Sequence, residues 1–206
     1  MSDLAPLPTT RRDRQRADTR ERLFEAAIAE FLQVGFAGAQ IPRIAEAAGV
    51  SRGTFYFHFP SKEHVLDELM ERAERAILER LSALRAKPPS FRSVLAQLLD
   101  AIEGESDHPE LGPLMRDVLA HYVRRDPGEP DSEGARGLLE ELAHHIQAAA
   151  DRGEIRRDVE PERLAAMVLT SLFGLIVTHR ASDPARRVDL ELMLDLLLDG
   201  MGPKPA

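Results

Sequence analysis

The stretch "GVSRGTFYFHFPSKE", residues 49–63, decides how the N-terminal part of this chain folds. It holds four of the ten aromatic residues in a chain of 206. Three of them, Phe55, Phe57 and Phe59, alternate along the chain as they would in a half-buried strand. The flanking residues have helical periodicity, however. We therefore predict a short helix at 52–59, which the following proline ends.

The residues before this helix complete a helix-turn-helix pattern. A short helix is predicted at 42–48, and Gly49 supplies the positive φ of the turn. Val50 fills the space between the two helices, and Ser51 can cap the next helix through its hydroxyl. Val50 and Phe55 stand at the hydrophobic-staple positions, so Phe55 is expected to point inward.

The two faces of the 52–59 helix have different compositions. Phe55 and Phe59 are four residues apart and share one face, which is expected to pack against the preceding helices. The other side, which can enter a major groove, carries Arg52, Gly53, Tyr56 and Phe57. This pattern is typical of a recognition helix.

Each residue of that side suits a particular contact with DNA. Arg52 can make a bidentate contact with guanine or bind a phosphate. Gly53 lets the backbone approach closely, and the Tyr56 hydroxyl can reach a phosphate, as can His58 at the helix end. Two roles stay open for Phe57: packing at the edge of the domain, or contact with DNA, for example with a thymine methyl group.

Lys62 lies in the first turn of the next predicted helix, where a cation opposes the helix dipole. This placement is explained if the helix N-terminus faces an anion. Ser61, the free amides and Lys62 would then hold one phosphate together. The alternative is that Lys62 extends into solvent.

The charge distribution separates a basic head from an acidic body. Residues 1–62 hold nine basic and seven acidic side chains, a balance of +2. The net charge of the chain is −8, which leaves −10 for residues 63–206. A head that alone contacts phosphate would have this asymmetry, although a solvated N-terminal tail would share it.

The fold is predicted to be all-α, with about nine helices. A flexible basic arm is expected at 1–17, a three-helix DNA-binding domain at 18–62, and a helical bundle, joined by a long helix, at 63–206. Helical periodicity is found at 18–34, 42–48, 52–59, 62–85, 91–104, 110–125, 132–152, 161–181 and 186–200. Gly35 is expected to end the first helix.

The segment "IAEAAGVSRGTFYFHFPSKEHVL", residues 44–66, resembles the DNA-binding domain of the TetR/AcrR family of bacterial transcriptional regulators. The resemblance implies an all-helical homodimer with a palindromic operator, in which the C-terminal bundle at 63–206 is a ligand-binding and dimerisation domain. It places the recognition helix at Ser51 to His58. It also implies DNA contacts by Arg52, Gly53, Thr54, Tyr56, His58 and Lys62.

Two segments depart from the family pattern or extend it. In "AGAQIPRIA" the family often has Thr just before the second helix, where this chain has Ala39 and Gln40, and Pro42 replaces a residue that touches DNA in some members. Contact with the DNA backbone through Gln40 or Arg43 and no contact at all both stay open. The arm "TTRRDRQR", 9–16, could enter a minor groove or attract DNA without specificity.

The predicted helices 161–181 and 186–200 are apolar over much of their circumference, so each should be buried on more than one side. A four-helix contact between two copies would suit a twofold dimer, and a single monomeric core is the alternative. The predicted dimer contacts are Leu172, Ile176, Leu192, Met193, Leu196 and Leu197. An apolar effector pocket is predicted from Met115, Val118, Tyr122, Met167, Phe173 and His179.

These observations favour a DNA-binding regulator, a repressor released by a small, largely apolar effector. The alternative is a helical ligand-binding or adaptor protein whose DNA-reading head is altered. No catalytic constellation or metal-ligand spacing stands out, and the chain has no cysteine, so neither an enzyme nor a cofactor is expected. The longest apolar run is too short to span a bilayer, and a cytoplasmic location is expected.

Overall fold

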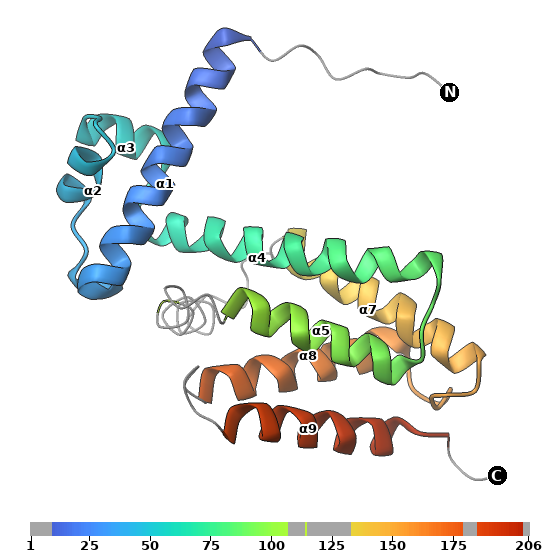
Figure 1. Cartoon of the computed structure of the whole chain (residues 1–206). Coiled ribbons are helices and arrows are strands. Elements are labelled where there is room, and N and C mark those ends of the chain that lie inside the picture. Colours follow the sequence, from blue (N-terminus) through green and yellow to red (C-terminus); the bar gives the residue numbers. More distant parts are fainter. Residues whose placement is uncertain (1–9, 107–113, 115–132, 179–184, 204–206) are drawn as a thin grey trace. The chain divides into compact units, whose positions relative to one another are not determined.

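The computed structural model describes residues 10–106, 114, 133–178 and 185–203, and within these ranges its regular structure is entirely helical. The chain divides into two compact units, Met1–Asp67 and Glu68–Ala206. Figure 1 shows the helices of each unit in sequence colours. The predicted all-α fold is confirmed.

Helix α1, Arg11–Gly38, begins earlier than the sequence pattern indicated. Thr10 caps it, because the Asp13 amide donates to the Thr10 hydroxyl at 3.2 Å and the Thr10 amide donates to the Asp13 carboxylate at 3.0 Å. This reciprocal pair is a capping box. Residues 11–17 are therefore the first turns of α1. The expected start at Asp18 and the flexible arm before it are wrong for these residues.

Gly35 interrupts α1 near its end, at φ 75° and ψ 158°. A side chain is strained at positive φ, and glycine is not. The predicted stop is thus a kink, after which the helix continues to Gly38. The Phe36 and Ala37 carbonyls, which follow this kink, accept hydrogen bonds from Lys62.

Helices α2, Ile41–Ala47, and α3, Arg52–His58, form the predicted helix-turn-helix. Gly49 has φ 67°. The Val50 amide donates to the Ala45 carbonyl at 2.9 Å and the Gly49 amide to the Glu46 carbonyl at 3.0 Å. This pair of hydrogen bonds is the Schellman motif, which ends α2 and sets the direction of α3.

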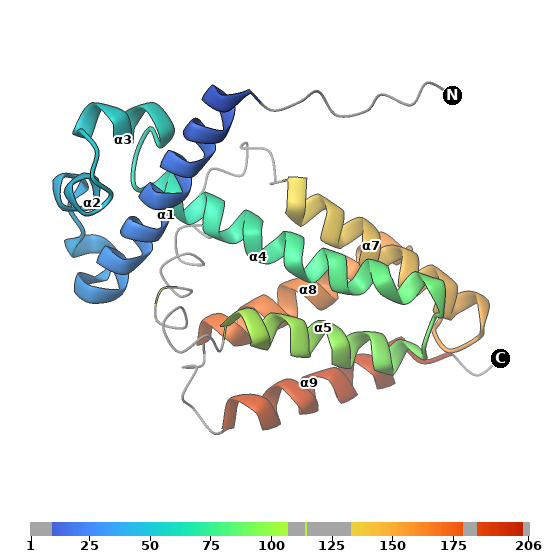
Figure 2. The same ribbon diagram turned by 45° about the horizontal axis from the view of Figure 1, so that its top comes forward.

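The second unit contains most of α4, Glu63–Ala83, followed by the short 3₁₀ turn Leu84–Ala86. Helices α5, Phe91–Ser106, α7, Glu133–Asp151, α8, Pro161–Thr178, and α9, Ala185–Met201, complete it. Helix α7 packs against α8, and α8 lies beside α9 in both views (Figures 1 and 2). The fully buried core residues include Leu95, Leu98, Leu142, Ile146, Val168, Leu172 and Leu190.

The helix expected at 110–125 lies outside the described residues except at Leu114, which is helical and buried. Among the described helices, none has the length and hydropathy needed to cross a membrane.

Candidate nucleic-acid interface

Helix α3 has a buried and an exposed face, as predicted. Phe55 and Phe59 are fully buried, and their ring centroids are 5.8 Å apart. Tyr56 is 49% exposed and Phe57 is 66% exposed, which is unusual for aromatic side chains. Arg52 and Gly53 are exposed beside them. The helix therefore presents a polar and aromatic surface on a firmly packed base.

Ser51 and Thr54 define the N-terminus of α3. The Ser51 hydroxyl oxygen accepts a hydrogen bond from the Thr54 amide at 3.1 Å, which is the predicted cap, and lies 2.9 Å from the Thr54 hydroxyl. A side chain added at Gly53 would meet only the Ser51 hydroxyl, at 3.7 Å. The folded unit itself therefore does not require glycine there, and the bare backbone leaves room for a partner.

The His58 side chain points inward, unlike the other predicted contacts. It is only 9% exposed, and its ring lies edge-on to Phe57 with centroids 5.1 Å apart. Burial, together with the charges of Arg20 and Arg16, lowers the pKa of His58 below its ordinary value of 6.5. In this geometry His58 is a neutral packing residue, which does not match the predicted phosphate contact.

Lys62 binds the end of α1. Its ammonium group donates to the Phe36 carbonyl at 2.7 Å and to the Ala37 carbonyl at 3.4 Å, and it lies 4.5 Å from the centroid of the Phe36 ring. A cation is favourable at a helix C-terminus. Meanwhile the Ser61 hydroxyl lies 3.0 Å from His64 Nδ1. The structure therefore does not assemble Ser61 and Lys62 around one anion, and α4 starts only at Glu63.

The start of α2 carries the two residues whose role the sequence left open. Gln40 is the N-cap residue and is exposed, and its side chain makes no capping hydrogen bond. Arg43 is half exposed, and its Nε lies 3.3 Å from the carboxylate of Glu30, a buried residue of α1. Gln40 is thus available to a partner, whereas Arg43 already helps to join α2 to α1.

Two arginines of α1 reach α3, and sequence reasoning missed these contacts, although it included Arg16 in the basic arm at 9–16. Arg20 Cζ lies 4.2 Å from the Phe59 centroid, and its guanidinium donates to the His58 carbonyl at 2.5 Å. Arg16 Cζ lies 5.0 Å from the centroid of the exposed Phe57 ring. The Thr10–Asp13 capping pattern could have revealed that Arg16 belongs to a helix. Its contact with Phe57 depends on how α1 crosses α3.

Helices α8 and α9 expose several apolar residues. Met167, Leu192 and Leu196 are each more than half exposed, and Met193 and Leu197 are partly buried. Leu172 is fully buried inside its own unit. Its predicted role as a dimer contact is therefore wrong, because a core residue offers no surface to a partner. Ile176 lies in α8, but its side chain is not among those that the structure describes.

The structure describes only two of the predicted effector-pocket residues. Phe173 is partly buried in α8, whereas Met167 is exposed and does not face a protein interior. The exposure of Met167 does not fit a pocket residue, since α8 turns this side chain outward. Met115, Val118, Tyr122 and His179 lie outside the described residues. Within the described ranges, no group of acidic or histidine side chains is arranged to hold a metal ion.

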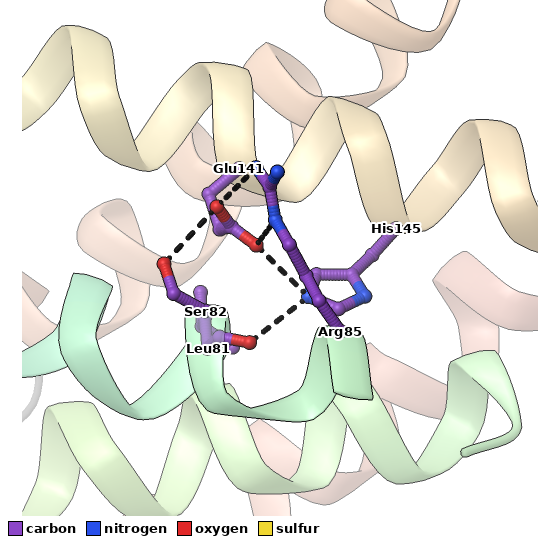
Figure 3. Close-up of polar contacts among 5 residues, drawn as sticks. All are labelled: Leu81, Ser82, Arg85, Glu141 and His145. Carbon is purple, nitrogen blue, oxygen red and sulfur yellow. Dashed lines mark hydrogen bonds and ion pairs between the residues drawn. The ribbon is translucent and has the colours of Figure 1, made fainter. Parts of the chain in front are cut away.

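A buried polar cluster joins α7 to the end of α4 (Figure 3). The Glu141 carboxylate accepts hydrogen bonds from Arg85, at 2.7 and 2.5 Å, and from the Ser82 hydroxyl at 3.1 Å. His145 Nε2 lies 3.3 Å from Glu141 and 3.1 Å from the Leu81 carbonyl. Both neighbours are acceptors, so Nε2 carries the proton. Burial raises the pKa of Glu141, but the hydrogen bonds from Arg85 and Ser82 outweigh it and leave the pKa below its usual range.

Comparison with known proteins shows which family this chain resembles. The family model described as "Bacterial regulatory proteins, tetR family" matches residues 23–69. The transcriptional repressor DhaR of Mycobacterium sp. (strain GP1) is 26% identical over 202 residues, covering 91% of this chain and 94% of DhaR. The nucleoid occlusion factor SlmA of Marinobacter nauticus is 30% identical over 154 residues, covering 74% of this chain and 76% of SlmA.

Among solved structures, the TetR-family repressor FadR of Thermus thermophilus, in complex with lauroyl-CoA, superposes with a TM-score of 0.70. It is 28% identical, and the match covers 91% of this chain and 97% of FadR. The helix-turn-helix with its exposed α3 face and the similarities to DhaR, SlmA and FadR indicate the same family. The chain is a DNA-binding transcriptional regulator that belongs to the TetR family.

Proposed function

We propose that this protein is a ligand-responsive repressor that binds a palindromic operator as a homodimer and is released by a small, largely apolar effector. The observation that carries the proposal is the exposed face of α3, on which Tyr56 and Phe57 stand in solvent above the fully buried Phe55 and Phe59. Exposing two aromatic rings is costly unless a partner covers them.

The contacts with DNA are assigned from exposure and chemistry. Arg52 reads a base or binds a phosphate, Gly53 and Thr54 admit the DNA backbone, and Tyr56 donates its hydroxyl to a phosphate. Ser51 and Gln40 lie at the N-termini of α3 and α2, where exposed polar groups suit phosphate. Lys62 and Arg43 instead contact α1, and His58 packs inside the unit.

The dimer is proposed to form through the exposed apolar residues of α8 and α9. Met167, Ser171 and Gly174 follow one another along one side of α8, and a side chain added at Gly174 would meet no atom within 4 Å. Such a surface admits a close helix from a second copy. A twofold dimer matches a palindromic operator, whose half-sites lie about one helical turn, 34–36 Å, apart.

The effector is proposed to be a small molecule with a long apolar part. Lauroyl-CoA is a reasonable first probe, because the FadR of Thermus thermophilus was solved with it. An effector that prefers one dimer geometry shifts the population away from the form that binds DNA. The apolar composition of the second unit suits such a ligand.

Fluorescence anisotropy with labelled duplexes from the region upstream of the gene tests the proposal. We expect one duplex to bind more tightly than random DNA, and Tyr56→Ala to weaken binding to both. Lauroyl-CoA should release the specific duplex. Binding that is equally weak for all duplexes at low salt, where phosphate contacts are strongest, would contradict the proposal.

A further inference from the structure

Three arginines of α1 form a stripe that leads toward α3. Arg12, Arg16 and Arg20 are spaced by four residues, so they lie on one side of the helix, about 6 Å apart along its axis. Arg12 and Arg16 are exposed, and Arg20 is partly buried.

The two inner arginines contact successive aromatic residues of α3. Arg20 lies on the buried Phe59 ring and donates to the His58 carbonyl, so it fixes the end of α3 to α1. Arg16 lies on the Phe57 ring, which is 66% exposed. An aromatic ring beneath a guanidinium restrains the guanidinium without neutralising its charge. The N–H groups at the edge of the guanidinium can still donate hydrogen bonds to a partner.

The local charges keep this region positive. Asp13, the acidic residue one turn before Arg16, receives hydrogen bonds from the Thr10 amide and hydroxyl, at 3.0 and 2.6 Å. These hydrogen bonds hold its carboxylate at the helix cap and lower its pKa, and the charge of Arg16 adds to that lowering. Arg16 and Arg20 also help to lower the pKa of the neighbouring His58, as expected where positive charge accumulates.

We propose that Arg16, held on the Phe57 ring, binds a DNA phosphate beside the groove that α3 enters, and that Arg12 extends this contact along the same strand. Phe57 is then a positioning residue that orients Arg16 and does not read a base. The inference rests on the proposed DNA binding of α3. It adds a phosphate contact from α1 to those proposed for α2 and α3.

The test measures affinity against salt for the operator and for a random duplex, using Arg16→Ala, Phe57→Leu and the double variant. The matched control is Arg136→Ala, which removes one exposed arginine from α7 in the other unit. Each phosphate contact contributes about 0.9 to the slope of log affinity against log salt. We expect Arg16→Ala to reduce the slope by about that amount for each bound subunit, and Arg136→Ala to leave it unchanged.

The pairing with Phe57 is tested by the double variant. Phe57→Leu should weaken both duplexes several-fold on the wild-type background and add nothing to Arg16→Ala. Circular dichroism confirms that each variant is folded. An unchanged slope in Arg16→Ala, or a Phe57→Leu effect that alters preference at one base pair and survives without Arg16, overturns the inference alone. A wild-type protein that binds neither duplex overturns the proposed function together with it.

Discussion

Arginine is used differently in the two units. In the second unit arginines form ion pairs with carboxylates: Arg85 with Glu141, Arg92 with Asp195, Arg152 with Glu154 and Arg156 with Asp158. The first unit also has such a pair, Arg43 with Glu30, but its Arg16 and Arg20 lie on aromatic rings. An ion pair cancels charge and stabilises the fold, whereas a ring holds the guanidinium and leaves its charge available. Arginine therefore stabilises the fold in both units, and in the first unit we propose that Arg16 also binds a polyanionic partner.

The largest effect on stability should come from removing a buried aromatic residue that packs beneath the exposed face of α3. Phe55→Ala should lower the free energy of unfolding by about 3–5 kcal/mol, because it empties a fully buried site. Phe57→Ala, the control on the opposite face, should cost below about 1 kcal/mol. Urea unfolding followed by circular dichroism measures both. Equal losses would show that the two faces of α3 are not distinct.

The next effect should come from the central ion pair of the second unit. Glu141→Gln should lower the free energy of unfolding by about 1–3 kcal/mol, because Arg85 and Ser82 lose their charged acceptor. The exposed neighbour Glu140→Gln is the matched control and should change little. DNA affinity of the folded variant should equal that of the wild type. A loss of DNA affinity without loss of stability would contradict the separation of roles.

Acid should weaken the first unit before the second. His58 and Glu141 both have a pKa lowered by folding, from ordinary values of 6.5 and 4.5. The unfolded chain therefore binds more protons, and the stability that each contributes is present above its ordinary pKa and is lost as pH falls.

Unfolding free energies measured from pH 8 to pH 4 should decline below about pH 6.5 through His58, and further below about pH 4.5 through Glu141. His58→Gln should remove the first decline and Glu141→Gln the second. If His58 instead bound a phosphate, DNA would raise its pKa, and affinity would increase in the acidic range in a His58-dependent way.

The smallest effect is expected at the surface. Arg92 of α5 and Asp195 of α9 form an ion pair at 2.6 Å in which both side chains are more than half exposed. A double-mutant cycle with Arg92→Ala and Asp195→Ala should give a coupling below about 1 kcal/mol, and high salt should reduce it. A larger coupling would mean that surface pairs in the second unit matter more than the comparison suggests.

Local signals made the helix-turn-helix predictable. The positive φ at Gly49, the Ser51 cap and the four-residue spacing of Phe55 and Phe59 each depend on neighbours in sequence. The start of α1 was missed although its signal, the Thr10–Asp13 capping box, is equally local. Asp18 and Glu21, three residues apart, also fit a capping box and favour the later start at residue 18. In that case the sequence contained two plausible starts, and the structure uses the earlier one.

The remaining errors concern tertiary contacts. A helix that is apolar nearly all round does not reveal which side meets its own core, so the surroundings assigned to Leu172 and Met167 do not fit their exposure. Lys62 was expected to face an anion, but the kink at Gly35 brings the Phe36 and Ala37 carbonyls to its ammonium group. Neither outcome follows from spacing along the chain.

The exposure of Tyr56 also provides a built-in spectroscopic reporter. The chain has no tryptophan and two tyrosines, of which Tyr56 stands on the exposed face of α3. In a Tyr122→Phe variant all intrinsic tyrosine emission comes from this one side chain. DNA that covers α3 should change this emission directly, without any attached dye. The recognition helix thus allows its own occupancy to be followed by fluorescence.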